Sequence, residues 1–140
     1  MLALIRISGL NKTNKKVEET MQRLRLKKKY TCVVIKEVPE MLGMVEKVRN
    51  CIAFGKIDEK TLIELIKARG KKIGASKAKV TDAEAIAKEV LSGKKLDELG
   101  VVPFFGLHPA RGGIDSKHHY PKGVMGDHKE KINELITRML

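Results

Sequence analysis

The chain has 140 residues, and its 42% hydrophobic content suffices for one modest core. Its 29 Lys and Arg against 17 Asp and Glu give a formal net charge of +12, which favours a polyanionic partner, nucleic acid ahead of a membrane surface. No segment approaches the ~18 apolar residues of a membrane span, and Arg6 interrupts the apolar N-terminus too early for a signal peptide, so we expect a soluble cytoplasmic protein.

The first part of the chain alternates strand and helix signals. Apolar residues at 2–8 predict a buried strand, the β-branched segment 31–38 predicts a second, and residues 53–57 predict a third. Asn11 to Asn14 offer N-cap residues for a helix after the first strand. The apolar faces of the two intervening helices have helical spacing: Val17, Met21 and Leu24 in the first, and Met41, Val45, Val48 and Ile52 in the second.

Two further helices are predicted in the middle of the chain. Asp58 and Gly70 bound the first of them as N-cap and terminating glycine. Thr81 and Glu84 form a capping box for the second, which ends near Gly93. Between these helices lies a basic run, which we expect to be a loop.

The last part of the chain predicts a loop and one closing helix. Residues 95–99 indicate a turn, and short strands are expected near Phe104 and Val124. Asp127 with Glu130 opens the last helix. Its core stripe comprises Ile132, Leu135, Ile136 and Met139.

The order of these elements predicts an α/β (α+β) fold. A βαβαβ core at 1–57 is followed by a helical extension at 58–140, which contains a basic, glycine-rich loop at 103–126. We expect residues 1–140 to form a single domain. Cys32 and Cys51 lack CxxC spacing and sit among apolar residues, which favours core packing in a reducing compartment over a disulfide.

Three groups of cations lie at loops or helix ends, where they would form a distributed phosphate-binding face. They are the run RLRLKKK at 23–29, the run KARGKKIGASKAK at 67–79, and the basic residues of the 103–126 loop. Each group alone is typical of a solvated surface, but three together favour nucleic-acid binding. The candidate RNA-binding cations are Arg23, Arg25, Lys27, Lys28, Lys29, Arg69, Lys71, Lys72, Arg111, Lys117 and Lys122.

Gly112 and Gly113 follow Arg111 directly and allow two compatible readings. Without a Cβ they let the backbone approach a phosphate or sugar closely, and they also suit a tight turn with positive φ. Arg111 offers a forked donor for phosphate or a plane that stacks on a base.

The histidines raise a second hypothesis, a metal-dependent nucleic-acid enzyme that uses His108, His118 and His119. Their spacing is a weak match to a zinc site, and hydrogen bonding or stacking in an RNA interface is the preferred role. Ser116 beside Asp115 and His118 lacks the G-x-S-x-G context of a nucleophile, and no P-loop motif occurs. We therefore predict no enzyme, no cofactor, no metal and no small-molecule substrate.

The scarcity of aromatic residues limits the type of nucleic-acid recognition. They make up 4% of the chain, and Trp is absent, which argues against a base-stacking platform. Recognition of phosphates and shape in a folded RNA is the remaining mode.

Several segments resemble the large-subunit ribosomal protein L thirty family, in the long archaeal and eukaryotic form that is related to eukaryotic L seven. These are IRISGLNK, VEETMQRLRL, TCVVIKEVPEMLGMVEKV and AFGKID in the N-terminal part, then FFGLHPARGG and DHKEKINELITRML. The resemblance spans essentially the whole chain, and the F-x-L-H-P-x-R-G-G motif is its most specific part.

The resemblance implies a ribosome-bound structural constituent of the large subunit with a ferredoxin-like core and a three-stranded sheet. Its partners would be large-subunit ribosomal RNA, with a role in stabilising the 5S RNA attachment region, and neighbouring ribosomal proteins. The motif positions implied as RNA contacts are His108, Pro109, Arg111, Gly112 and Gly113.

Overall fold

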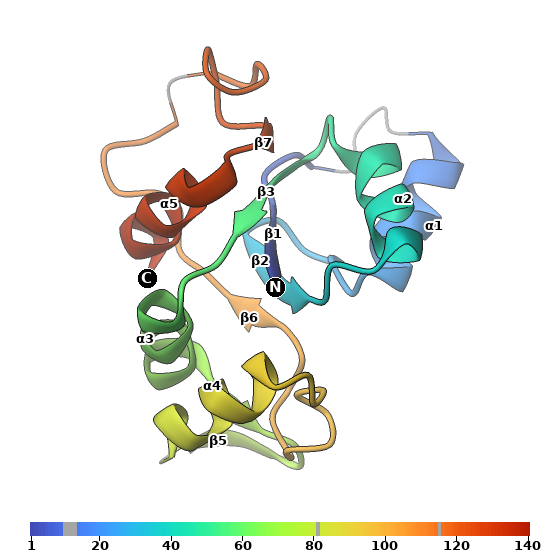
Figure 1. Cartoon of the computed structure of the whole chain (residues 1–140). Coiled ribbons are helices and arrows are strands. Elements are labelled where there is room, and N and C mark those ends of the chain that lie inside the picture. The colour runs from blue at the N-terminus through green and yellow to red at the C-terminus, as the bar shows by residue number, and fades with distance from the viewer. Residues whose placement is uncertain (10–13, 81, 115) are drawn as a thin grey trace.

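The computed structural model describes residues 1–9, 14–80, 82–114 and 116–140, and for 75–79 it describes the backbone alone. Within these described ranges, five α-helices and two sheets follow one another in a βαβαβ order and then a mixed extension (Figure 1). The elements are β1 (Leu2–Arg6), α1 (Lys15–Arg23), β2 (Thr31–Ile35), α2 (Pro39–Val48), β3 (Ile52–Lys56), α3 (Glu59–Arg69), β4 (Lys71–Lys72), β5 (Ala75–Lys79), α4 (Ala83–Leu91), β6 (Phe105–Gly106), β7 (Gly126–Asp127), a 3-10 turn (Lys129–Lys131) and α5 (Ile132–Met139).

The main sheet has the order β6-β2-β1-β3-β7. β1 is central and antiparallel to both β2 and β3, β6 is antiparallel to β2, and β7 is parallel to β3. The α/β class and the βαβαβ core are confirmed, but the expected three-stranded sheet is wrong, because β6 and β7 extend it to five strands. Strands of two residues are too short to produce an alternating pattern in the sequence.

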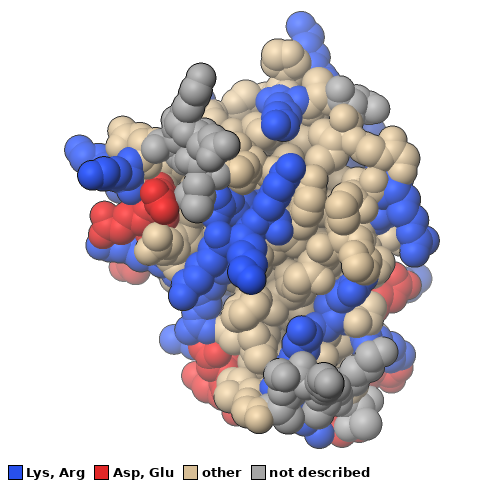
Figure 2. All heavy atoms as spheres, turned by 180° about the vertical axis from the view of Figure 1, so that it is seen from behind, with Lys and Arg blue, Asp and Glu red and all other residues tan. Residues whose placement is uncertain are grey.

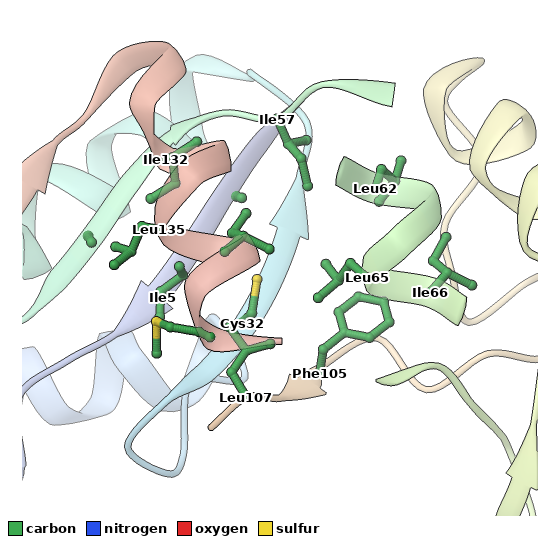
Figure 3. Packing of buried hydrophobic residues seen from close by; sticks show 14 of the residues in the cluster. Ile5, Cys32, Ile57, Leu62, Leu65, Ile66, Phe105, Leu107, Ile132 and Leu135 are labelled. Atoms are coloured by element: carbon green, nitrogen blue, oxygen red, sulfur yellow. The ribbon is translucent and has the colours of Figure 1, made fainter. Parts of the chain in front are cut away.

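Successive side chains along the strands point to opposite faces of the sheet, where they belong to two separate hydrophobic clusters. Leu4 and Val33 face the cluster that α1 and α2 cover, whereas Ile5 and Cys32 face the cluster that α3 and α5 cover. Figure 3 shows Ile5, Cys32 and Phe105 meeting side chains of α3 and α5 in the second cluster. Cys32 and Cys51 belong to different clusters and are free thiols, as expected for cysteines that serve core packing.

Several element boundaries differ from the expected ones. The first two strands end at Arg6 and Ile35, and Ile52 belongs to β3, where it is buried against α1 and α2, instead of to the second helix. The basic run expected to be a loop instead contains the hairpin β4–β5. The sequence of this hairpin, KKIGASKAK, lacks the apolar alternation that marks a strand.

The helix caps agree with the sequence in part. Asn14 caps α1 by accepting a hydrogen bond from the Lys16 N–H at 3.2 Å, while Asn11 and Thr81 lie outside the described residues. Asp58 occupies the N-cap position of α3 but makes no side-chain cap bond. Among the described helices none is both long and apolar enough to cross a membrane.

Candidate nucleic-acid interface

The first basic run ends in a loop, residues 24–30, that a buried arginine holds in place. Arg6 is 2% exposed, and its guanidinium donates to the backbone carbonyls of Leu26 at 2.8 Å and Lys27 at 2.7 Å. The Tyr30 N–H donates to the Arg6 carbonyl at 2.7 Å. A buried charge with several acceptors is fixed in orientation, so the loop backbone is held at a defined place on the sheet.

This anchored loop at 24–30, which we call the lysine loop, presents Lys27, Lys28 and Lys29 to solvent. The Lys29 ammonium lies 4.8 Å from the centroid of the Tyr30 ring, within the range of a cation–π contact. Tyr30 itself has a φ of 61°, so the chain reverses there before it enters β2.

The segment after β6 is attached to the same place. β6 pairs with β2 at Thr31 and Cys32, and the Leu107 N–H donates to the Tyr30 carbonyl at 3.0 Å. The backbone at 107–113, which carries the HPARGG motif, therefore leaves the sheet beside the lysine loop.

The C-terminal end of α5 fixes the HPARGG turn. Arg138 donates to the Arg111 carbonyl from Nε at 3.1 Å and from Nη2 at 2.9 Å, and Nη2 also donates to the Gly113 carbonyl at 2.8 Å. The His108 N–H donates to the Met139 carbonyl at 2.9 Å. Gly112 and Gly113 have φ of 80° and 79°, so the tight-turn reading of the two glycines is confirmed.

A groove of about 380 Å³ separates these two segments. Its walls include Lys29 and Tyr30 on one side, and Pro109, Gly113 and Lys117 on the other. The structure thus brings Lys29 of the first basic group beside Lys117 of the basic loop. Figure 2 shows Lys and Arg side chains gathered in a band across the middle of one face, with Asp and Glu towards its edge.

The rest of the predicted loop is folded on itself. The Ser116 hydroxyl donates to the Lys122 carbonyl at 2.7 Å, and the Val124 N–H donates to the Ser116 carbonyl at 3.1 Å. Lys117, His118, His119 and Lys122 are exposed on this compact loop. His128 differs from them, because it is 7% exposed, its Nε2 lies 2.7 Å from the Val124 carbonyl, and its ring lies 4.7 Å from that of Tyr120.

The second basic group lies elsewhere. Lys71 and Lys72 are exposed on β4, whose hairpin is hydrogen-bonded to the 100–102 segment, and no described residue of 67–79 lines the groove. Arg69 donates to the Leu140 carbonyl at 2.6 Å and is partly buried, which is a structural role. Three separate groups were expected to form one face. Among the described residues, this groove brings together only Lys29 of the first group and Lys117 of the third, whereas Arg23 and Arg25 line a different groove.

Two arginines of the first run pair with carboxylates. Arg23 lies 2.7 Å from Glu19, and Arg25 lies 2.8 Å from Asp97. The hydrogen bond that the Arg25 guanidinium donates to the Asp97 carboxylate raises the pKa of Arg25 above its ordinary value. Both pairs are exposed and therefore weak, so these guanidinium groups can exchange a carboxylate for a phosphate at low cost.

The histidine geometry does not favour the metal-dependent alternative. In the ranges that the structure describes, no three His, Cys, Asp or Glu side chains lie close enough to hold a metal ion. His108, His118 and His119 are exposed, and among the described side chains none of them forms an ion pair with a carboxylate. These rings are available to donate or stack, which is the preferred role.

Two positioning residues were missed by the sequence reasoning. Arg6 was noted only for interrupting an apolar segment, although a charged residue inside a buried strand signals a bound set of carbonyls. Arg138 lies in the last turn of a short amphipathic helix, where basic residues are common, so no sequence signal distinguished it.

Comparisons with known proteins agree with one another. The family model described as "Ribosomal protein L30p/L7e" matches residues 2–52. A protein of Archaeoglobus fulgidus named "Large ribosomal subunit protein uL30" is 39% identical over 153 aligned residues, which cover 99% of each chain. Proteins with the same name from Desulfurococcus amylolyticus and Nanoarchaeum equitans are 42% and 35% identical to this chain. Both alignments cover 100% of this chain, and they cover 98% and 99% of the two relatives, respectively.

Proposed function

Because the chain belongs to the ribosomal protein L30p/L7e family, we propose that it is a structural constituent of the large ribosomal subunit that binds ribosomal RNA. Its role is structural rather than enzymatic, since the relatives are named as components of the subunit. Ribosomal RNA and neighbouring ribosomal proteins are its partners, and its location is on the ribosome.

The observation that carries the RNA-binding proposal is the meeting of Lys29 and Lys117 across one groove beside the HPARGG turn. Exposed cations bind phosphates more tightly when the backbone that carries them is already ordered, because less conformational entropy is then lost on binding. Arg6 orders one wall of this groove and Arg138 orders the other. The result is a pair of rigid, basic edges that suit a folded RNA backbone.

Arg111 is the residue we assign to the most specific contact. Its side chain is exposed while its carbonyl is held by Arg138, so the turn aims the guanidinium away from the body of the protein. A planar forked donor binds two phosphate oxygens or stacks on an unpaired base. The exposed imidazoles of His108, His118 and His119 and the ring of Pro109 would flank that contact.

Binding of the purified chain to fragments of large-subunit ribosomal RNA tests the proposal. Arg111→Ala should weaken binding by ~1–3 kcal/mol. Lys60→Ala, which removes one exposed cation from α3 outside all three basic groups, is the matched control and should change the affinity little. Equal affinities for the two variants would remove Arg111 from the interface.

We extend the proposal to the region where 5S RNA attaches to the subunit. Large subunits assembled with and without the chain can be compared by hydroxyl-radical footprinting of both RNAs. The proposal expects new protection in the large RNA and a changed reactivity at its junction with 5S RNA. Protection of the large RNA with an unchanged 5S pattern would leave RNA binding in place and refute the 5S role.

A further inference from the structure

The outer edge of β2 is covered along only part of its length. β6 pairs with β2 at Thr31 and Cys32, whereas β2 continues to Ile35. Within the described sheet, the edge at 33–35 therefore has no strand beside it. Backbone N–H and C=O groups on an open edge are a template for pairing with another extended chain.

A groove of about 400 Å³ follows this open edge. One wall comes from the end of α1 and the start of α2, with the capping residues Leu24 and Val38 and with Met41. The other comes from α4 and the turn after it, with Val90 and Leu96. Val38 on this wall is 40% exposed, although it lies beside the buried side chains of the groove. An apolar partner would bury this surface, which the chain leaves in water.

The rim of the same groove is basic. Among the described residues, five Lys and Arg side chains line it against a single Asp, and that residue, Asp97, is paired with Arg25 at 2.8 Å. Lys36 Nζ lies 3.0 Å from the place that a Cβ on Gly93 would occupy, so the lysine reaches from the end of β2 across to the end of α4.

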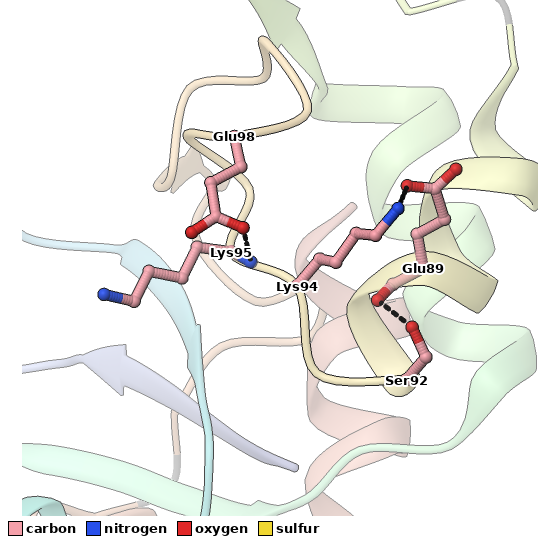
Figure 4. A network of polar contacts seen from close by, with 5 residues as sticks. All are labelled: Glu89, Ser92, Lys94, Lys95 and Glu98. Carbon is pink, nitrogen blue, oxygen red and sulfur yellow. Dashed lines mark hydrogen bonds and ion pairs between the residues drawn. The ribbon is translucent and has the colours of Figure 1, made fainter.

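The lysines after α4 are oriented differently from each other, as Figure 4 shows. Lys94 lies 2.9 Å from Glu89 on α4, whereas the Glu98 carboxylate accepts a hydrogen bond from the Lys95 backbone N–H at 3.4 Å. The Lys95 ammonium points away from both carboxylates and towards the sheet. It lines the groove with Lys36, and neither forms an ion pair with a described carboxylate.

We propose that this β2-edge groove binds an extended segment of a partner protein that carries apolar side chains and Asp or Glu. The open strand edge supplies main-chain hydrogen bonds, the apolar walls take alternate side chains, and the basic rim selects acidic ones. A nucleic acid fits the groove poorly, because no described residue that lines it is aromatic and a strand edge offers no ladder to a phosphate backbone. This groove shares no lining residue with the Lys29–Lys117 groove that carries the RNA-binding proposal. It does include Arg23 and Arg25 of the first basic run, but its open strand edge and its Lys36 and Lys95 lie outside the three basic groups.

An NMR titration of the isotope-labelled full-length chain tests the proposal with a synthetic peptide of about seven residues, in which Val alternates with Asp or Glu. The amide signals of 33–35 and the side-chain signals of Val38 and Met41 should shift together, and amide exchange at 33–35 should slow. Lys36→Glu combined with Lys95→Glu should weaken binding by about tenfold, because two attractive contacts become repulsive. Both lysines are exposed, so the variant is expected to fold, and its amide spectrum checks this.

Three controls make the result decisive. Lys47→Glu combined with Lys60→Glu reverses the same charge on exposed parts of α2 and α3 outside the groove and should leave the affinity within about twofold. A peptide with Ser in place of Val, and one with N-methylated backbone amides, should each bind at least about tenfold more weakly. A single-stranded RNA oligonucleotide of similar length should not shift the signals of 33–35.

Shifts spread over the whole basic surface would overturn the proposal, as would equal affinity for the Val and Ser peptides. Absence of peptide binding would also overturn it. If the RNA oligonucleotide moved the edge signals and the peptide did not, the groove would belong to a nucleic-acid site instead.

Discussion

Replacing Arg6 tests how the lysine loop is held, because this one side chain joins β1 to the backbone of 24–30. Arg6→Met keeps most of the buried volume and removes the guanidinium. Besides its bonds to Leu26 and Lys27, the guanidinium donates from Nε to the Ser8 carbonyl at 3.0 Å. The change therefore leaves three carbonyl oxygens without their donor.

The magnitude follows from the burial of these acceptors. Only the bond to Leu26 is fully buried, and losing it costs ~2–3 kcal/mol, because the carbonyl cannot turn to water. The bonds to Lys27 and Ser8 are partly buried, and rehydration limits the loss to ~0.5–1 kcal/mol each. The sum is ~3–5 kcal/mol, a large fraction of the ~5–15 kcal/mol that stabilises a typical domain.

Urea unfolding followed by circular dichroism measures this loss, with Arg6→Lys as the matched variant. Lysine keeps the positive charge but can donate to only some of the three carbonyl oxygens. The free energy of unfolding of Arg6→Lys should therefore lie between those of the wild type and Arg6→Met. If Arg6→Met lost less than ~1 kcal/mol, the three hydrogen bonds would not be holding the loop, and the reasoning would be refuted.

Three further predictions concern the turn, the core and the sheet. Arg138→Ala should weaken binding of large-subunit RNA by about tenfold, since the turn at Arg111 must then be ordered on binding. Burial raises the pKa of the Cys32 thiol from 9.0 to about 12. The unfolded chain then loses its thiol proton first as the pH rises, so the free energy of unfolding should fall between pH 9.0 and about 12, by up to ~1.4 kcal/mol per unit. Gly55→Ala should cost ~2–4 kcal/mol, because the new Cβ would meet the Lys129 carbonyl and lie 2.9 Å from Ile132 Cβ.

Each of these predictions has its own control. Arg49→Ala removes an exposed arginine at the C-cap of α2, outside all three basic groups, and an equal effect on RNA binding would show that Arg138 acts only through its charge. Cys32→Ala should abolish the part of the alkaline loss that comes from the thiol, and an unchanged pH profile would refute that assignment. Gly43→Ala, with no atom of a described residue within 4 Å of the new Cβ, should stabilise α2 by ~0.5–1 kcal/mol. A similar result at Gly55 would contradict the packing of α5 on β3.

The core of the fold was predictable because its signals are local. Alternating or continuous apolar residues gave β1, β2 and β3, and helical spacing gave the buried faces of α1, α2 and α5. β6 and β7 were placed only approximately, near Phe104 and Val124, and their membership of the main sheet was missed. Strand partners of two residues are chosen by tertiary packing, which leaves almost no trace in the sequence.

The candidate interface was predictable in composition but not in arrangement. Charge and glycine content singled out the lysine loop and the HPARGG turn, and the structure places these on one groove. The hairpin lysines Lys71 and Lys72 were grouped with them on composition, although the chain path carries that hairpin elsewhere. Arg6 and Arg138 were missed, because their role depends on which carbonyls the fold brings within reach.

The salt dependence of RNA binding shows whether an ordered set of cations neutralises RNA phosphates. The slope of the logarithm of the affinity against the logarithm of salt concentration reports how many phosphates are neutralised. Changing Lys27, Lys28 and Lys29 together to Ala should make this slope shallower by ~2–3, whereas the same change at the exposed Lys47, Lys60 and Lys88 should leave it nearly unaltered. Equal slopes for wild type and the lysine-loop variant would contradict the account.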